Sequence, residues 1–388
     1  MLVIRNDKFV KLKNELYIIG SSNNDLYRNN VAQMGKVVIL AWSVEPSKSD
    51  VSRLKKLDHI EGLEVKLYPD NLSILEKVKV IKDEVRKCRC VSLKMTLNDA
   101  YIGCHYAIKY KKPFVIESGT YSWGSLVTHG GSIIYKLAAV PFELLAKYYH
   151  WRAKYIIYVS RFYLQRYYKS NAKCIGCPDV ALNPVEPIVL ERRLTKIAEK
   201  NGKDEYILGL IGQSNAEYRG HDTLIDVASI LVQKGFNIKI RFLGGGRSND
   251  KRIARARALG IEDRVAFEGY MNHDDVLKWL ESIDVLVMPT LQETLGRSII
   301  EAMSRACPVV GSTETAIGEQ IGSDCLAPAR DKAAISSIIE KMIKNKEYMK
   351  YCAQENFIRA HKYYSIYTNE EKREFYYDFY RDNKINIF

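Results

Sequence analysis

The chain has 388 residues, of which 47% are hydrophobic and 27% charged, so it can bury a sizeable core and is not an intrinsically disordered chain. At roughly 100–200 residues per domain, this length predicts two domains. Lys and Arg number 59 against 46 Asp and Glu, and the net charge of +13 points to an anionic partner: nucleic acid, an acidic membrane surface or a phosphorylated small molecule.

No segment offers the ~20 uninterrupted apolar residues that a membrane-spanning helix needs. The nearest candidate, residues 132–151, is broken by Lys136, Glu143 and Lys147. The first 14 residues lack the apolar core of a secretory signal. We therefore expect a cytoplasmic protein.

Short aliphatic and β-branched runs alternate with helical patterns along the whole chain. The first half has predicted strands at 15–19, 37–42, 63–67, 91–95, 114–117 and 155–159. The second half has predicted strands at 206–211, 238–243, 265–268, 285–288 and 309–311, with helices at 223–234, 248–259 and 274–282 between them. This alternation predicts an α/β protein made of two doubly wound domains with parallel sheets.

The boundary between the two series falls near Pro184 and Pro187, since two prolines so close together stop regular structure. We assign residues 1–185 to an N-terminal domain and 186–365 to a C-terminal domain. Residues 366–388 are rich in Tyr and in charge, and we expect them to form a helix that packs back on the N-terminal domain.

Loops at the carboxyl ends of strands hold the ligands of doubly wound sheets. Arg219 lies between the predicted strand 206–211 and the next helix, where a guanidinium can bind a phosphate in bidentate fashion. A lone Arg at such a place can equally be a solvated surface residue. Gly244, Gly245 and Gly246 follow the strand 238–243 and allow either close backbone approach to a ligand or an ordinary turn.

The loop after the strand 285–288 carries two carboxylates eight residues apart, Glu293 and Glu301, on either side of a predicted helix start near Arg297. Carboxylates accept hydrogen bonds from hydroxyl groups, and the free N–H groups of a helix start suit a phosphate. A sugar nucleotide has hydroxyls at both ends and a diphosphate between them. Two solvated glutamates would show the same spacing, so the pattern alone leaves both interpretations open.

Segment 289–312, which contains Glu293, Glu301-Ala302-Met303 and Cys307-Pro308-Val309-Val310, resembles the Glu-x7-Glu element of family 4 (GT4) glycosyltransferases of the GT-B fold. Within that family it is similar to enzymes of bacterial exopolysaccharide, O-antigen and capsule assembly. The resemblance covers residues 206–326 closely and the first half more weakly, at 112–120 and 155–168. It implies two Rossmann-like domains that face a cleft, the first for the acceptor and the second for the donor.

The resemblance also implies residue roles in the donor site. Glu293 would bind hydroxyls of the donor sugar, Glu301 the ribose hydroxyls and Arg219 the diphosphate. The other donor-binding residues would be Gly212, Gln213, Gly244, Tyr270, Met271, Thr294, Leu295, Gly296 and Arg297. Gln213 stands where the family has an Arg, so one phosphate cation is missing, and Arg297 is a candidate replacement.

From the same resemblance we expect a retaining sugar transfer that requires no metal, with a nucleotide diphospho-sugar donor: a UDP-sugar, with a GDP-sugar as the alternative. The sequence has no Asp-x-Asp at a strand end and no His/Cys cluster at ligand spacing. Glu293, Arg219 and His129 are the catalytic candidates. Ser21, Glu117 and His129 are the candidates on the acceptor side, although a lone His is more often structural.

Residues 132–173 contain eight Lys or Arg against one acidic residue, with aromatic residues between them. This pattern suits a peripheral protein at the anionic inner face of the cell membrane, where lipid-linked acceptors lie, and it equally suits a core helix with a solvated basic face. No RNA- or DNA-binding motif is present, so we expect no nucleic-acid partner.

Three functions remain open from the sequence. The first is transfer of a sugar to a glycan or lipid-linked acceptor in cell-surface polysaccharide biosynthesis. The second is epimerisation of a sugar nucleotide on the same fold. The third is a non-catalytic subunit that binds a sugar nucleotide.

Overall fold

The computed structural model describes residues 1–13, 15–19, 24–46, 54–95, 98–129, 133–178, 180, 182, 185–364 and 368–386. The chain divides into two compact units. The first comprises residues 1–127, 132–177 and 367–388, and the second comprises residues 128–131 and 178–366. The chain thus leaves the first unit, forms the second, and returns to the first with its last helix.

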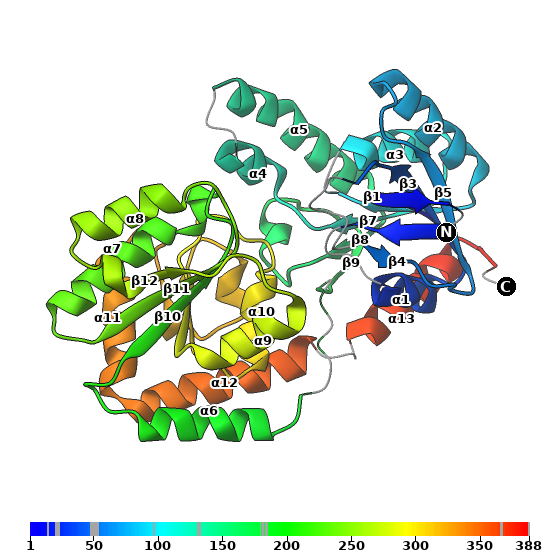
Figure 1. The fold of residues 1–388 in the computed structure, drawn as a ribbon. Helices are drawn as coiled ribbons and strands as arrows, with labels where there is room; N and C mark the ends of the chain where they lie inside the picture. The colour runs from blue at the N-terminus through cyan, green and yellow to red at the C-terminus, as the bar shows by residue number, and fades with distance from the viewer. Residues whose placement is uncertain are drawn as a thin grey trace. The chain divides into compact units, whose positions relative to one another are not determined.

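The first unit is built on a nine-stranded sheet (Figure 1). Its strands are β1 (Leu2–Leu12), β2 (Glu15–Ile18), β3 (Val37–Ser43), β4 (Lys55–Lys56), β5 (Leu63–Pro69), β6 (Val91–Lys94), β7 (Phe114–Ser118), β8 (Tyr155–Tyr158) and β9 (Lys173–Gly176). Seven of them are parallel, in the order β5-β3-β1-β6-β7-β8-β9. β2 pairs antiparallel with the end of β1, and β4 pairs antiparallel with β2.

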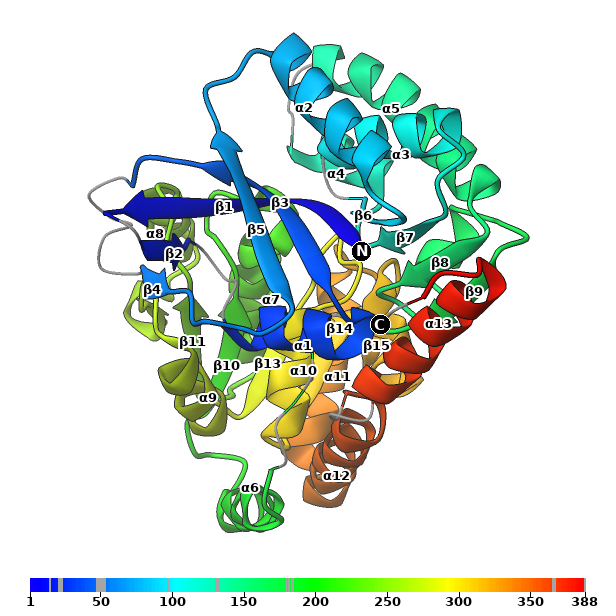
Figure 2. The same ribbon diagram turned by 90° about the vertical axis from the view of Figure 1, so that its right-hand side faces the viewer.

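Helices cover both faces of this sheet. They are α1 (Asn24–Met34), α2 (Ile74–Lys87), α3 (Asn98–Lys109), α5 (Ile133–Arg152) and α13 (Thr368–Asp382). Helix α4 (Ser122–His129) precedes α5 along the chain. Figures 1 and 2 both show α1 and α13 side by side on one face, with α2, α3 and α5 on the other. Helix α2 starts with a capping box: Ser73 receives a hydrogen bond from the Glu76 N–H, and the Glu76 carboxylate accepts one from the Ser73 N–H at 2.8 Å.

The second unit is a six-stranded parallel sheet in the order β12-β11-β10-β13-β14-β15. The strands are β10 (Tyr206–Ile211), β11 (Ile238–Leu243), β12 (Val265–Phe267), β13 (Val285–Met288), β14 (Val309–Ser312) and β15 (Leu326–Ala327). Numbered along the chain this is the order 3-2-1-4-5-6, whose direction reverses between β10 and β13. Ligands of such sheets bind outside the carboxyl ends of the strands at that switch point.

Helices α7 (His221–Gln233), α8 (Asn249–Ala258) and α11 (Lys332–Lys344) cover one face of this second sheet (Figure 1). Helices α6 (Ile188–Glu199), α9 (His273–Ser282), α10 (Arg297–Ser304) and α12 (Lys346–Tyr364) cover the other. All four side chains of β13 are fully buried, as expected for a strand covered on both faces.

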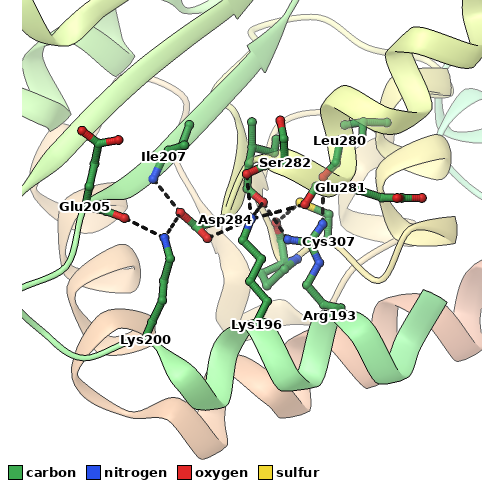
Figure 3. A network of polar contacts seen from close by, with 12 residues as sticks. Arg193, Lys196, Lys200, Glu205, Ile207, Leu280, Glu281, Ser282, Asp284 and Cys307 are labelled. Carbon is green, nitrogen blue, oxygen red and sulfur yellow. Dashed lines mark hydrogen bonds and ion pairs between the residues drawn. The ribbon is translucent and has the colours of Figure 1, made fainter. Parts of the chain in front are cut away.

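Helix α6 is fastened to the C-terminal end of α9 by two cationic side chains (Figure 3). Arg193, which is buried, donates to the carbonyls of Leu280 and Ile283 at 2.8 and 2.6 Å. Lys196 donates to the carbonyls of residues 281, 282 and 283 at 3.3, 2.6 and 3.0 Å. Cations at a helix C-terminus bond its free carbonyls and oppose the negative end of its dipole.

Asp284 joins this contact to the beginning of β13 (Figure 3). Its buried carboxylate accepts from the Ile207 N–H of β10 at 2.7 Å and pairs with Lys196 at 3.2 Å and Lys200 at 2.5 Å. The network lies at the amino ends of β10 and β13. It therefore fixes these two strands from the end opposite to the loops that follow them.

The predicted pair of doubly wound domains with parallel sheets is confirmed, with one addition and four strands that were missed. The addition is the antiparallel pairing of β2 and β4 in the first sheet. The sequence did not predict four strands: β4, β9, β15 and β1, an 11-residue strand at the centre of the first sheet. Among the described residues no helix is long and apolar enough to cross a membrane.

Candidate functional site

The loops that follow β10 and β13 are joined to each other at the switch point. The carbonyl of Tyr218, in the first loop, accepts from the Leu291 N–H at 2.9 Å and the Thr290 hydroxyl at 3.1 Å, both in the second. Gly220 has a φ of +83°, and a Cβ there would lie 2.3 Å from the carbonyl oxygen of Pro289. Only glycine allows this approach, so the two loops form one rigid surface.

Arg219 and Glu293 lie on this surface and form an ion pair. The Arg219 Nη1 donates to the Glu293 Oε2 at 2.7 Å, and the two side chains are 26% and 17% exposed. The other Glu293 oxygen accepts from the Thr294 N–H at 3.1 Å. The Arg219 stem crosses Gly212, whose absent Cβ leaves room for the Cγ and Cδ at 3.3 Å. Burial opposes the charge of Arg219, but Glu293 and Tyr218 together raise its pKa, so it stays a cation.

The glycines after β11 approach neighbouring backbone closely. Gly244 donates to the Gly269 carbonyl at 2.7 Å, and with a φ of +131° its missing Cβ would fall 2.3 Å from the Gly212 oxygen. Gly245 lies under the ring of Tyr270, which is 58% exposed. Met271, the next residue, packs against the core of the second unit.

Helix α10 begins at the edge of the same surface. Gly296 adopts the left-handed conformation, with a φ of +73°, immediately before the first helical residue, Arg297. The side-chain amide of Gln320 donates to the Leu295 carbonyl and fixes the turn. The first N–H groups of any helix have no acceptor within it, which is the arrangement that favours an anion.

Glu301 lies four residues into α10 and is mostly buried, with its side chain 15% exposed. Burial raises its pKa, while His273 and Arg297 act in the opposite direction. The His273 Nδ1 is 3.7 Å from the Glu301 Oε1. A carboxylate held in such surroundings is a strong hydrogen-bond acceptor for hydroxyl groups.

All the predicted donor residues thus lie in the second unit, in loops at the carboxyl ends of its strands or in the first turns of α10. Arg219 and Glu293 are in direct contact, and Gly212, Gly244 and Gly269 meet through their backbones. Gln213 is exposed and its carbonyl accepts from the Ala216 N–H at 3.1 Å. Arg297, the candidate replacement for the missing cation, acts electrostatically on Glu301.

The sequence did not identify three residues that support this site. Tyr218 holds the two loops together and places its ring 5.2 Å from the Arg219 guanidinium. Gln320 fixes the turn before α10, and His273 pairs with Glu301. Of these three residues, only His273 could have been proposed from the sequence, because it closely follows the predicted site residues Tyr270 and Met271 and starts a helix.

In the first unit, the side chain of Glu117 is 13% exposed and is bonded to the last helix. One carboxylate oxygen accepts from Ser92 at 3.0 Å and Tyr376 at 2.8 Å, and the other accepts from Lys372 at 3.0 Å. These three hydrogen bonds use three of the roughly four acceptor sites of the carboxylate. Ser21 and the side chain of His129 lie outside the described residues.

The described residues contain no group of three His, Cys, Asp or Glu side chains arranged to hold a metal ion. The groups that the candidate site presents are a guanidinium, two carboxylates and a helix start. Together they can bind an anionic diphosphate beside hydroxyl groups.

Sequence comparison connects this arrangement with known proteins. Residues 205–345 match the family model described as glycosyl transferases group 1. Protein CapJ of Staphylococcus aureus is 24% identical over 375 residues, which cover 95% of this chain and 92% of CapJ. The putative glycosyltransferase EpsD of Bacillus subtilis is 26% identical over 207 residues, covering 52% of each chain.

The fold is shared with solved structures. HepE of Anabaena, whose structure is a complex with UDP-glucose, superposes with a TM-score of 0.66 at 15% identity, over 96% of this chain and 98% of that one. At this level of identity the similarity establishes the common fold of the two chains.

Proposed function

We propose that this chain, a glycosyltransferase of the GT-B fold with its group 1 domain at residues 205–345, transfers a sugar from a nucleotide diphospho-sugar with retention of anomeric configuration. The acceptor is a glycan or a lipid-linked molecule in cell-surface polysaccharide biosynthesis. The donor is a UDP-sugar, with a GDP-sugar as the alternative. HepE, which shares the fold, is solved with UDP-glucose, and this supports a nucleotide-sugar donor.

The contact between Arg219 and Glu293 carries the proposal. A group that binds anions and a group that binds hydroxyls lie 2.7 Å apart at the switch point of the sheet. A ligand with a hydroxyl-bearing carbon beside a phosphate can touch both groups at once. The sugar and the β-phosphate of a nucleotide diphospho-sugar fit this description on either side of the bond that breaks.

In this proposal Arg219 and the N–H groups at the start of α10 stabilise the negative charge that grows on the departing diphosphate. Donors placed in advance where charge develops contribute about 10²–10³ in rate each. Glu293 holds the sugar hydroxyls and Glu301 the ribose. The GT4 resemblance supports a reaction in which no metal is required.

The proposed reaction takes place at the inner face of the cell membrane. A lipid-linked acceptor requires the enzyme to work as a peripheral protein at the inner face of the cell membrane. Residues 132–173 contain eight Lys or Arg and one acidic residue, and this excess of positive charge supports such a location.

The test is a thermal-shift screen of the purified protein against UDP-, GDP-, ADP- and dTDP-sugars, because a ligand that binds the native state raises Tm by mass action. We expect one nucleotide class to stabilise the protein. The stabilising sugar is then incubated with isolated membranes as the acceptor source, and NMR reads the anomeric configuration of the product. Inversion would contradict retention. Conversion of the donor in the absence of acceptor would make the chain an epimerase, and stabilisation without any turnover would make it a binding subunit.

A further inference from the structure

Helix α5 of the first unit has two distinct faces. Its inward face carries Ala139, Ala146 and Tyr149, all buried, together with two polar side chains that have partners inside the unit. Glu143 accepts from the Tyr168 hydroxyl at 3.1 Å, and His150 contacts the Ser118 hydroxyl at 2.9 Å. This face attaches the helix to its own unit.

The outward face of α5 is apolar and exposed to solvent. It carries the docking stripe, which consists of Leu137, Val140, Leu144, Tyr148 and Trp151, with exposures of 68, 44, 62, 45 and 63%. At 100° per residue these five side chains fall within an arc of about 80° on the helix. Scattered exposed apolar residues need no explanation, but a continuous row of large ones marks an interaction surface.

Cations flank the docking stripe on both sides. Lys136 and Lys147 lie along one edge and Arg152 along the other, and all three are exposed. Glu143, the one acidic residue in residues 132–173, is turned inward with its side chain 9% exposed. Lys147 pairs with Glu143 at 3.4 Å, so the outward face combines an apolar centre with edges whose exposed charged side chains are cationic.

We propose that α5 is an interfacial helix that docks this enzyme on an anionic lipid bilayer. Leu137, Leu144 and Trp151 enter the boundary between headgroups and acyl chains, and the flanking cations meet the anionic headgroups. An apolar face bordered by cations binds membranes through buried apolar area plus attraction to anionic lipid. The location rests on the proposed lipid-linked acceptor, whereas the docking itself requires neither donor nor catalysis.

The test uses the full-length protein and sedimentation with two kinds of vesicle. One contains phosphatidylglycerol and phosphatidylethanolamine, and the other contains phosphatidylcholine alone. We expect strong binding to the first and at least tenfold weaker binding to the second. Wild-type protein that ignores both vesicles, or binds both equally, would overturn the proposal.

Three variants separate the parts of the surface. The triple change Leu137→Ser, Leu144→Ser and Trp151→Ser should lower binding to the anionic vesicles at least tenfold. Neutralising Lys136, Lys147 and Arg152 to Gln should remove the preference for anionic lipid. The matched control is Tyr351→Ser with Ile358→Ser, two side chains of α12 that are 53 and 54% exposed, and it should bind like the wild type.

Two further readouts complete the test. Lipids brominated in their acyl chains should quench the wild-type tryptophan fluorescence more than that of Trp151→Phe. Light scattering of the free proteins should show the same mass for the wild type and the triple variant. A dimer lost in the triple variant would assign the stripe to a second copy of the chain and overturn the proposal. Donor-induced thermal shifts measured on the same samples report the donor site alone, so docking and the proposed function can fail separately.

Discussion

Arg219 and Glu293, which are 74 residues apart in the sequence, share a hydrogen bond of 2.7 Å between Nη1 and Oε2. The pair joins the loops that follow β10 and β13, the two strands between which the order of the second sheet reverses. The ion pair therefore connects a phosphate-binding group and a hydroxyl-binding group at the place where this fold binds ligands.

Removal of the Arg219 charge should slow transfer far more than it weakens binding of the donor. Arg219→Gln removes the cation beside the leaving diphosphate, and we expect kcat to fall by about 10²–10³. Arg219→Lys keeps the charge but loses the planar fork, so it should recover only part of the rate. Initial rates with saturating donor measure this. The matched control is Arg257→Gln on α8, which removes an exposed ion pair with Glu262, and it should keep the wild-type rate.

Adjacent glycines should respond differently to the same substitution. Gly244→Ala places a Cβ 2.3 Å from the backbone oxygen of Gly212 at a φ of +131°, so it should lower the free energy of unfolding by at least about 2 kcal/mol. The three atoms nearest to a Cβ at Gly245 all belong to the exposed ring of Tyr270, a side chain that can move aside. Gly245→Ala should keep the wild-type Tm and weaken donor binding several-fold. Urea unfolding and donor titration measure the two effects, and a fully stable Gly244→Ala protein would contradict this account of the loop.

Donor binding should depend on pH through Glu301. Burial raises the pKa of this carboxyl, so its protonated form appears at a higher pH than for an ordinary glutamate. The protonated form accepts fewer hydrogen bonds from hydroxyls, so donor affinity should fall as the pH drops through that raised pKa. Titrations between pH 8 and pH 5 measure this. Glu301→Gln should bind weakly with little dependence on pH.

His273 provides the internal check on this pH dependence. It lowers the pKa of Glu301, so His273→Asn should move the loss of donor affinity to higher pH. His361→Asn, on α12 of the same unit, should leave the profile unchanged. An identical profile for wild type and His273→Asn would show that the contact at 3.7 Å does not control Glu301.

Glu117 should stabilise the first unit by holding α13. Burial alone would raise its pKa, but Lys372, Lys94 and the hydrogen bonds from Tyr376 and Lys372 bring it down to about 2. With an unfolded value of ~4.3, the stabilisation is complete above that pH and is lost as the pH falls towards 2. Glu117→Gln should therefore lower the free energy of unfolding at pH 7 by about 3 kcal/mol.

Urea unfolding at pH 7 and pH 3 tests the direction of this pH dependence of stability. The difference between wild type and Glu117→Gln should shrink at the lower pH. Glu15→Gln, which removes an exposed partner of Lys56, should change stability little. A Glu117→Gln protein as stable as the wild type at pH 7 would contradict the prediction that this carboxylate stabilises the first unit.

The sequence predicted the second sheet well because its strands are covered on both faces and read as apolar runs, such as Val285–Met288. It did not predict β1, whose middle contains Arg5, Asn6 and Asp7. In the structure Arg5 and Asp7 pair with each other at 2.7 Å, and the register shifts between Ile4 and Asp7. A bulge with its own ion pair thus interrupts the apolar pattern without ending the strand.

The loops of the candidate site were predictable, but the contacts within it were not. Motif spacing located Arg219 and Glu293 separately, and only the strand order brings them together. The partners of Glu117 are even more remote, since Lys372 lies 255 residues away. The pattern of α5 fitted both a core helix and a membrane-facing helix, and the exposure of Leu137, Leu144 and Trp151 distinguishes the outward face from the inward one.

The most direct test of the central claim is the transfer rate of Glu293→Ala, measured beside its affinity for the nucleoside diphosphate that lacks the sugar. If Glu293 holds the donor sugar, turnover should fall by about 10²–10³ while the affinity for the nucleoside diphosphate stays within a few-fold of wild type. Normal turnover by purified Glu293→Ala protein would contradict the assignment of the donor site.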